Sequence, residues 1–439
     1  MTPSGDGAGG TGAGGEPAAP IVPVTPIVPV TPPLAALAPP SLPAFTLGRL
    51  PRIEFGPGRF GLVPEIVAGH GHRVLLVTGG RSFARSPRRA WLESALTERD
   101  VALTGEVSVT GEPTPDAVDD AVSRHHDGGV DAVLGIGGGS VLDAAKAIAG
   151  LLRSGTSVRD HLEGTGPGLP YPGLAVPFVA VPTTAGTGSE ATRNAVLTER
   201  GAAGFKRSFR DERLVASDAV VDPDLIAGAP RPLIAANGLD ALTQLLESFV
   251  STRAMPVTDA LALSGLASAR NGLLRWYADP DGPDAPAARS GMAYAALLSG
   301  ICLANAGLGA IHGLASPLGA FFPIPHGAAC GAVAAATVRT NVRALAARDP
   351  GSEALGRYAR LGRLLGGLDD RATDEDAQTV LVDLLAAWTA ELDVPGLSAF
   401  GVTEADVDRI VGGSRGSSMR TNPVVLEDRE IAEIVLASM

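Results

Sequence analysis

An α/β domain with a doubly wound parallel sheet, followed by an all-helical domain, is the fold that this sequence predicts. The length of 439 residues favours two domains over one. In the first half, short apolar runs alternate with helical stretches, as in a parallel sheet with crossover helices. Strand signals end near Leu225, and the rest of the chain is patterned as helices. We expect a tail at 1–44, the α/β domain at 45–228 and the helical domain at 229–439.

Residues 1–44 are predicted to form a disordered tail. They are rich in Gly and Ala at first and then carry the hexapeptide Ile-Val-Pro-Val-Thr-Pro twice, at 21–26 and 27–32. Proline at this density excludes helix and central strand and leaves an extended, polyproline-II-like segment. A docking motif for a proline-reading partner is the alternative.

Strands and helices alternate in the predicted α/β domain. The expected strands are 52–56, 74–78, 132–136 and 178–181. The expected helices are 90–99, 115–126 and 141–153. The short apolar strands lead directly into Gly or Pro, as buried parallel strands do. Because such sheets bind ligands at the carboxyl ends of their strands, we expect the binding site in the loops that follow.

The second domain is predicted to contain eight helices, separated by Gly, Pro or Asp. They are 232–251, 257–276, 287–304, 327–347, 352–366, 375–391, 403–412 and 428–438. A cleft between this domain and the α/β domain would be a normal place for a cofactor and a substrate to meet.

Composition limits the classes of partner. A net charge of −12 argues against nucleic acid, because phosphate binding needs concentrated Lys and Arg. Two basic groups, at 81–89 and 206–213, are interpreted as solvated surface, with local anion binding in a cofactor cleft as the alternative. The chain shows no evident secretory signal and no run of about twenty apolar residues free of Pro or charge, so no membrane partner is expected.

Cysteine usage indicates the redox setting. Only Cys302 and Cys330 are present, both in apolar surroundings. One disulfide would hardly stabilise so long a chain, so we expect a reducing, cytoplasmic setting. Both residues are interpreted as buried, inert thiols.

Two loops after neighbouring strands have the character of a phosphate-binding site. Gly137-Gly138-Gly139-Ser140 opens a helix, where glycines let backbone N–H groups approach a phosphate and the helix N-terminus adds partial positive charge. Thr183, Thr184 and Thr187 supply hydroxyl and amide donors in the second loop. A tight turn and a capped helix start are the simpler alternatives. The two loops together indicate a diphosphate bound between them.

A second set of residues, Asp240, Gln244, His312 and His326, resembles the metal-binding helices of the iron-containing alcohol dehydrogenases. Asp240 and Gln244 are four residues apart in a helical segment and share one face. His312 and His326 are expected to come from a second helix and the loop after it. One carboxylate, one amide and two imidazoles would suit Fe²⁺ or Zn²⁺, with positions left for a substrate. In the alternative, Gln244 only packs or forms hydrogen bonds and no metal is held.

Taken together, these motifs resemble the iron-containing alcohol dehydrogenases. The resemblance extends from residue 50 onward and includes Asp143, Lys146, Lys206 and Asn422-Pro423. It implies a Rossmann-like dinucleotide-binding domain, in which Asp143 and Lys206 contact the cofactor, and a helical metal-binding domain, the dehydroquinate synthase-like architecture. It also implies interconversion of alcohols and carbonyls with a nicotinamide cofactor, by a homodimer or larger homo-oligomer.

The chain departs from that family at the predicted cofactor site. An Asp that usually follows the strand at 74–78 accepts the ribose 2′-hydroxyl of NAD, and Gly79 stands in its place. Without this carboxylate, Arg81 or Ser82 could hold a 2′-phosphate. The sequence therefore predicts NADP(H) in preference to NAD(H).

Two further departures concern the reaction itself. Gln244 stands where the family has a metal-binding histidine, and Ser316 stands where it has a histidine for proton relay. Serine does not titrate near neutrality, so it can only pass a proton along a water chain. We expect Asp240, His312 and His326 to hold the metal and Ser316 to face the nicotinamide.

The expected substrate is a small functionalised aldehyde or ketone that carries its own activating group, such as a carboxylate or phosphonate. Three alternatives remain open at this point. They are a metal-free reductase of the same fold, a dehydroquinate synthase-like lyase and a non-catalytic homologue.

Overall fold

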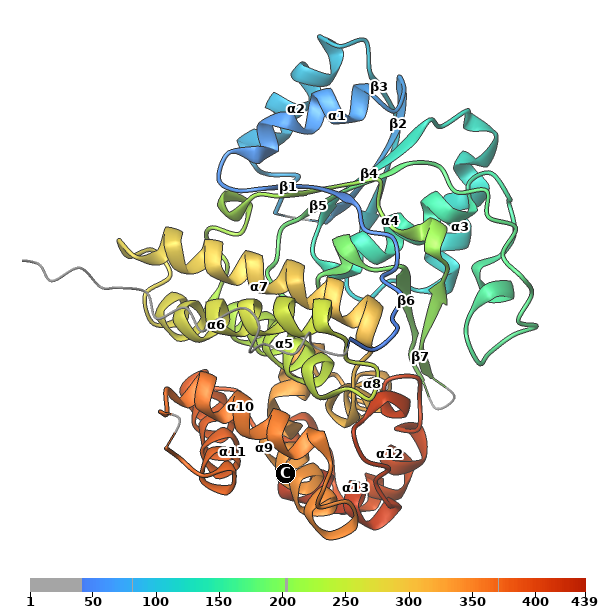
Figure 1. Ribbon diagram of the computed structural model, residues 1–439. Helices are drawn as coiled ribbons and strands as arrows, with labels where there is room; N and C mark the ends of the chain where they lie inside the picture. Colours follow the sequence, from blue (N-terminus) through green and yellow to red (C-terminus); the bar gives the residue numbers. More distant parts are fainter. Residues whose placement is uncertain (1–41, 81, 202–203, 370) are drawn as a thin grey trace, which may run out of the picture. The chain divides into compact units, whose positions relative to one another are not determined.

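Six parallel strands in the order β1-β8-β5-β4-β2-β3 form the sheet of the computed structural model (Figure 1). The structure describes residues 42–80, 82–201, 204–369 and 371–439. The strands of the sheet are β1 (Arg52–Phe55), β2 (Arg73–Gly79), β3 (Ala102–Val109), β4 (Ala132–Gly137), β5 (Phe178–Pro182) and β8 (Asp218–Val221). A separate antiparallel hairpin consists of β6 (Asn194–Glu199) and β7 (Phe205–Arg210).

All four predicted strands are present, as β1, β2, β4 and β5, and the predicted parallel sheet is confirmed. β3, β8 and the hairpin are additional strands. β3 is a partly exposed edge strand that contains Gly105 and Glu106, and β8 has only four residues. Neither has the apolar run by which a buried strand is recognised in a sequence.

The order of the strands produces a switch point beside β2. This strand pairs with β3 on one side and with β4 on the other, and the chain continues from β4 to β5 and β8 on that second side. Doubly wound sheets bind ligands in the crevice where the order reverses. Gly79 ends β2 and Gly137 ends β4, so both lie at that crevice.

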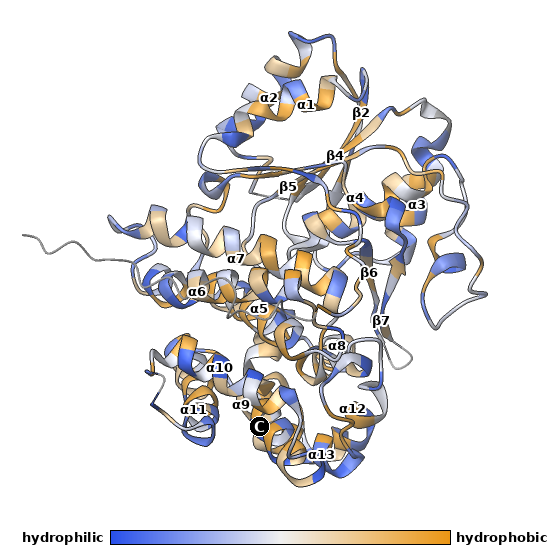
Figure 2. Ribbon diagram, viewed as in Figure 1, coloured by the Kyte–Doolittle hydropathy of each residue, from blue (hydrophilic) through white to orange (hydrophobic). Residues whose placement is uncertain are grey.

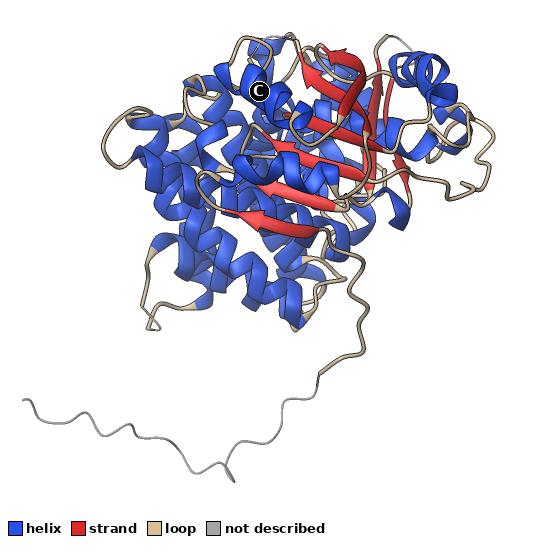
Figure 3. Ribbon diagram, turned by 90° about the horizontal axis from the view of Figure 1, so that it is seen from above, coloured by secondary structure: helices blue, strands red, loops and turns tan. Residues whose placement is uncertain are grey.

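Helices cover both faces of the sheet (Figure 3). Those of the α/β part are α1 (Val63–Ala68), α2 (Pro87–Thr97), α3 (Pro115–His125) and α4 (Gly139–Leu151). Successive side chains of a strand point to opposite faces. Accordingly, Val74 and Leu76 of β2 pack in one core with α1 and α2, whereas Leu75 and Val77 pack in another with α3 and α4.

The predicted helical domain is confirmed as a set of nine α-helices within the described residues. They are α5 (Arg231–Val250), α6 (Pro256–Ala278), α7 (Ala285–Ala306), α8 (Ala310–Phe321), α9 (His326–Arg348), α10 (Glu353–Gly366), α11 (Asp374–Glu391), α12 (Val407–Gly413) and α13 (Asp428–Ala437). The ninth is α8, a short helix with Pro317 in its interior. Figure 2 shows apolar residues concentrated on the central strands and on α5 and α7.

One described helix, α7, is long and apolar enough to cross a membrane. In the structure, 67% of its most apolar window is buried against other parts of the protein. It belongs to the same apolar core as α5 and α6, as expected of a core helix.

Residues Ala44–Met439 form a single unit that contains both the sheet and the helical part. The boundary predicted at 228/229 falls in the connection between β8 and α5. The predicted tail at 1–44 lies outside the described residues up to position 41. The backbone N–H of Gly48 donates to Oδ1 of Asn305 at 2.7 Å, which fixes the start of the unit to α7.

Candidate active site

Three polar side chains that could bind or orient a ligand lie buried on one face of α5. Asp240, Gln244 and Glu247 are spaced by four and then three residues, so they point to the same side. Each is at most 3% exposed. Burying carboxylates at this depth requires partners of opposite charge or hydrogen-bond donors.

Glu247 supplies the link between α5 and α8. Its Oε1 accepts from the backbone N–H of Ile311 at 2.6 Å, and its Oε2 lies 2.7 Å from Nδ1 of His312. The carboxylate therefore satisfies the first turn of α8 and fixes the imidazole at the same time. The other ring nitrogen of His312, Nε2, faces Oδ1 of Asp240 at 3.3 Å.

The second histidine does not lie in the predicted loop. His326 is the first residue of α9, and Pro325 occupies the N-cap position. Cys330 follows one helical turn later on the same face. It is fully buried, as predicted, but its neighbours are polar.

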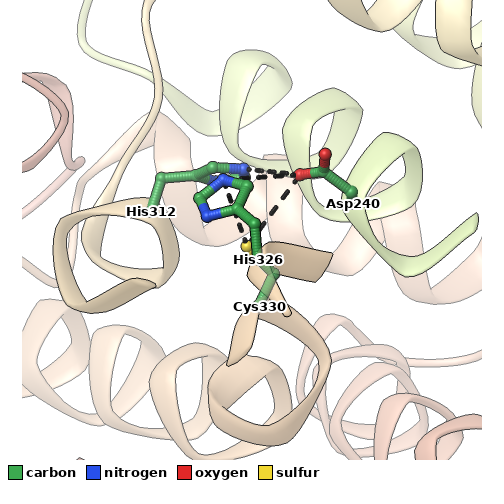
Figure 4. Close-up of side chains that lie close together, drawn as sticks. All are labelled: Asp240, His312, His326 and Cys330. Carbon is green, nitrogen blue, oxygen red and sulfur yellow. Dashed lines mark hydrogen bonds and ion pairs between the residues drawn. The ribbon is translucent and has the colours of Figure 1, made fainter. Parts of the chain in front are cut away.

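Four side chains that bind metals converge at this point from α5, α8 and α9 (Figure 4). One ligand atom from each of Asp240, His312, His326 and Cys330 lies within 4.8 Å of all the others. Nε2 of His326 is 3.8 Å from Oδ1 of Asp240 and 4.0 Å from Sγ of Cys330. One carboxylate, two imidazoles and a thiol fit a divalent transition metal.

The residues of this cluster alter one another's protonation. Burial alone would raise the pKa of Asp240, but His326 and His312 lower it below its ordinary value. Burial alone would lower the pKa of His312, but Cys330 and Asp240 raise it well above its ordinary value. The two histidines likewise lower the pKa of Cys330, against the effect of burial. These shifts all arise from attraction between the histidines and the acidic groups of the cluster.

Gln244 is held by two hydrogen bonds. Its Oε1 accepts from the hydroxyl of Ser299 on α7 at 2.7 Å, and its Nε2 donates to Oδ1 of Asp240 at 3.1 Å. The amide oxygen, which is the only atom of Gln244 able to bind a metal, is therefore engaged by Ser299. These are the hydrogen bonds of the alternative interpretation, and Gln244 as a metal ligand stays a prediction.

A cavity of about 700 Å³ connects this cluster with the carboxyl-terminal edge of the sheet. Asp240, His312 and His326 contribute to its wall, and so does Ser316, which follows His312 by one turn. Predicted cofactor residues that line the same cavity are Gly139, Ser140, Asp143, Thr187 and Lys206. The predicted metal site and part of the predicted cofactor site therefore line the same cavity.

The two phosphate-type loops lie side by side, because β4 and β5 are neighbours. A Cβ atom on Gly139 would lie 2.6 Å from Oγ1 of Thr187, and one on Gly138 would lie 3.1 Å from Cγ2 of Thr184. The glycines therefore allow the threonine loop, which starts at Thr183, to approach the N-terminus of α4. α4 presents its positive end at the cavity.

Two predicted cofactor residues are already engaged by other side chains. Asp143 accepts from the hydroxyl of Ser189 at 2.5 Å and lies 3.6 Å from Nζ of the buried Lys146. Nζ of Lys206 lies 3.0 Å from Oε2 of Glu112. Both residues line the cavity, and their charges are partly balanced within the protein.

The structure describes two of the three residues that were predicted to select for the 2′-phosphate of NADP(H). Gly79 is partly buried at the end of β2, and Ser82 is exposed beyond it. Arg81 lies outside the described residues. A Cβ atom on Gly79 would be 3.6 Å from Cγ2 of Val141, an ordinary contact, so the position has room for a side chain.

Arginines line the cavity on the side formed by β7 and the segment after α12. They are Arg207, Arg210, Arg415 and Arg420. Arg210 lies 3.4 Å from Glu163, yet its Nε is buried with no hydrogen-bond partner among the described residues. Burial lowers the pKa of Arg210, and Arg193, Arg420 and Arg253 lower it further. This part of the wall therefore carries an excess of positive charge.

Sequence models of known families match nearly all of the chain after its tail. The model described as iron-containing alcohol dehydrogenase matches residues 51–223. The model for the C-terminal part of the Fe-containing alcohol dehydrogenase family matches residues 234–439. The chain belongs to the iron-containing alcohol dehydrogenase family.

Individual members of the family agree with this assignment. Alcohol dehydrogenase 4 of Schizosaccharomyces pombe is 33% identical over 354 residues, which cover 79% of this chain and 78% of that protein. The structure of a 1,3-propanediol oxidoreductase matches with a TM-score of 0.79 and 28% identity over 90% of this chain and all of the other. Sulfoacetaldehyde reductase from Bifidobacterium kashiwanohense, solved in complex with NAD⁺, has a TM-score of 0.77 and 26% identity, covering 90% and 98%. The predicted family and fold are confirmed, and the protein is an oxidoreductase of this alcohol dehydrogenase family.

Three features of this iron-containing alcohol dehydrogenase were missed in the sequence. Glu247 is signalled only by being a buried acid seven residues after Asp240 on one helix. Cys330 was interpreted as inert because the residues beside it in the sequence are apolar, whereas its polar neighbour Asp240 lies ninety residues away in the chain. Arg420 follows α12 and meets the arginines of β7 only through the fold.

Proposed function

We propose that this protein reduces small aldehydes or ketones that carry an anionic group, with NADPH as reductant and a divalent metal as electrophile. The observation that carries the proposal is the single cavity shared by the metal-type cluster and the two phosphate-type loops. The nicotinamide supplies a hydride when bound, and the metal stabilises negative charge on the carbonyl oxygen. The remaining tasks fall to the side chains of the cavity.

Asp240, His312 and His326 would hold the metal. Glu247 keeps Nε2 of His312 directed at the cluster, because its carboxylate engages Nδ1. The hydroxyl of Ser316 lies in the cavity wall and can pass a proton from water at its Oγ without itself titrating. The glycines at 137–139 and Thr184 and Thr187 would receive the diphosphate of the cofactor.

The arginines support an anionic substrate. Among the described residues, neither Arg207 nor Arg420 has a carboxylate within 4.0 Å, and Nε of Arg210 has no partner. A carboxylate, sulfonate or phosphonate can accept paired hydrogen bonds from such guanidinium groups. The substrate named for the Bifidobacterium relative, sulfoacetaldehyde, is an aldehyde of this kind.

NADPH is proposed because no carboxylate follows β2 where it would oppose a 2′-phosphate. Gly79 ends that strand, and Ser82, exposed a few residues later, offers a hydroxyl donor. The proposed preference for NADPH over NADH can be measured by titrating the protein with each cofactor.

The substrate class is tested by steady-state oxidation of NADPH with 4-oxobutanoate and with butanal, which have the same chain length. We expect kcat/KM to be at least about tenfold higher for the anionic aldehyde, equivalent to about 1.4 kcal/mol. Arg210→Ala and Arg420→Ala should remove this advantage and leave butanal turnover nearly unchanged. Arg343→Ala, which removes a surface partner of Glu433 outside the cavity, is the matched control. A preference for butanal, or turnover with neither aldehyde, would contradict the proposal.

A further inference from the structure

Cys330 stands out among the ligand-type side chains because nothing in the proposed reaction uses it. Its Sγ is 3.9 Å from Oδ1 of Asp240 and 4.0 Å from Nε2 of His326. With metal–nitrogen bonds of about 2.0–2.1 Å and a metal–sulfur bond of about 2.3 Å, tetrahedral ligand atoms lie about 3.3–3.6 Å apart. The observed separations exceed that range by only a few tenths of an ångström.

Close packing of α9 against α5 brings Cys330 to this position. A Cβ atom on Gly327 would lie 1.8 Å from the carbonyl oxygen of Ala236, and one on Gly331 would lie 2.5 Å from Cδ1 of Leu239. Glycines beside His326 and Cys330 thus remove the side chains that would keep the two helices apart. The same turn of α9 therefore directs both an imidazole and a thiol at Asp240.

The competing fourth ligand is Gln244, and its geometry is less suitable. Its amide oxygen accepts from Ser299, and its amide nitrogen, which has no lone pair to offer, faces Asp240. Ligation through Oε1 would require the amide to turn over and to break the bond from Ser299. Cys330 needs no such change, since its sulfur already faces the cluster (Figure 4).

We propose that the thiolate of Cys330 is the fourth protein ligand of the metal and that Gln244 is a positioning residue for Asp240. This inference rests on the metal of the proposed function. Binding would release the thiol proton to solvent and form the metal–sulfur bond. A thiolate is a soft donor, so the site should favour Zn²⁺ over the harder Mg²⁺ or Mn²⁺. His326 is partly exposed and lines the cavity, so a substrate in the cavity would reach the metal from that side.

Cobalt(II) is a suitable probe, because thiolate ligation produces a near-ultraviolet charge-transfer band whereas oxygen and nitrogen ligands alone do not. The full-length protein, freed of metal, is titrated with Co²⁺. We expect one equivalent to bind with both this band and visible d–d bands. Since Cys302 and Cys330 are the only cysteines, Cys302→Ala is the matched control and should keep the band. Gln244→Ala should keep it as well.

Cys330→Ser should retain the d–d bands but lose the charge-transfer band, and it should bind Zn²⁺ roughly tenfold or more weakly in competition with a chromophoric chelator. Cys330→Ala provides a second variant, and circular dichroism establishes that each is folded. Stoichiometric Co²⁺ binding by the wild type without the band would overturn the thiolate ligand and leave the metal-assisted function standing. Absence of Co²⁺ and Zn²⁺ binding by the folded wild type would overturn both.

Discussion

Oε2 of Glu247 lies 2.7 Å from Nδ1 of His312, while Nε2 of the same ring faces Asp240 at 3.3 Å. The imidazole is therefore held between two buried carboxylates. With Nδ1–H donating to Glu247, the lone pair of Nε2 is free for a metal. Glu247 thereby determines which nitrogen of His312 serves the site.

Replacing Glu247 with Gln should weaken metal binding by about 10–100-fold, because an amide oxygen is a poorer acceptor and no longer raises the basicity of the ring. Zn²⁺ affinity measured by chelator competition checks this. Glu433→Gln, at an exposed ion pair with Arg343, is the control and should leave the affinity unchanged. Equal affinities for the Glu247 variant and the wild type would show that His312 is oriented by other means.

Replacing Gly79 with Asp should reverse the cofactor preference from NADPH to NADH. The new carboxylate would accept the ribose 2′-hydroxyl and repel a 2′-phosphate. A Cβ atom at this position would make only an ordinary contact with Cγ2 of Val141, at 3.6 Å. Fluorescence titration of both cofactors measures the two dissociation constants. A wild type that prefers NADH by tenfold, about 1.4 kcal/mol, would refute the assignment.

Glu190 should make the stability of the protein fall as the pH rises. Burial raises the pKa of Glu190 to about 7 from its ordinary value of 4.5. Between these two values the folded state holds a proton that the unfolded state has lost, so rising pH destabilises the fold by up to about 3 kcal/mol. Glu190→Gln should not show this loss, and its melting temperature should exceed that of the wild type increasingly from pH 5 to pH 8. Melting curves that shift in parallel would contradict the raised pKa.

Removing residues 1–44 should leave the melting temperature and activity unchanged. The truncated chain would begin at Phe45, which is exposed, and would retain the Gly48–Asn305 hydrogen bond. Proline-rich sequence of this kind contributes little buried apolar area to offset its ordering entropy. Differential scanning fluorimetry of both forms provides the comparison, and a drop of several degrees would mean that the tail packs on the folded unit.

The elements found from the sequence are those whose signals are local. β2, β4 and β5 are continuous apolar runs, and Gly137–Ser140 places its glycines where a strand turns into a helix. The hairpin β6–β7 is different, since it mixes basic and apolar residues and carries no buried run. The two strands and their antiparallel pairing are evident only from the structure.

The residues of the metal-type cluster also differ in whether a local sequence pattern reveals them. Asp240, His312 and His326 follow a recognisable spacing, and the structure brings them together. Cys330 has no such signal, because its significance depends on the distance between α5 and α9. That distance is determined by helix packing at Gly327 and Gly331, which a one-dimensional pattern does not contain.

The most direct test of metal-assisted reduction is the rate of NADPH oxidation with 4-oxobutanoate before and after metal removal. The purified protein is assayed as isolated, after dialysis against a chelator with metal content measured, and after addition of Zn²⁺. We expect activity to fall in proportion to the metal lost and to return when Zn²⁺ is restored. Full turnover by protein shown to contain no metal would contradict the central claim and would require the carbonyl to be activated by hydrogen bonds alone.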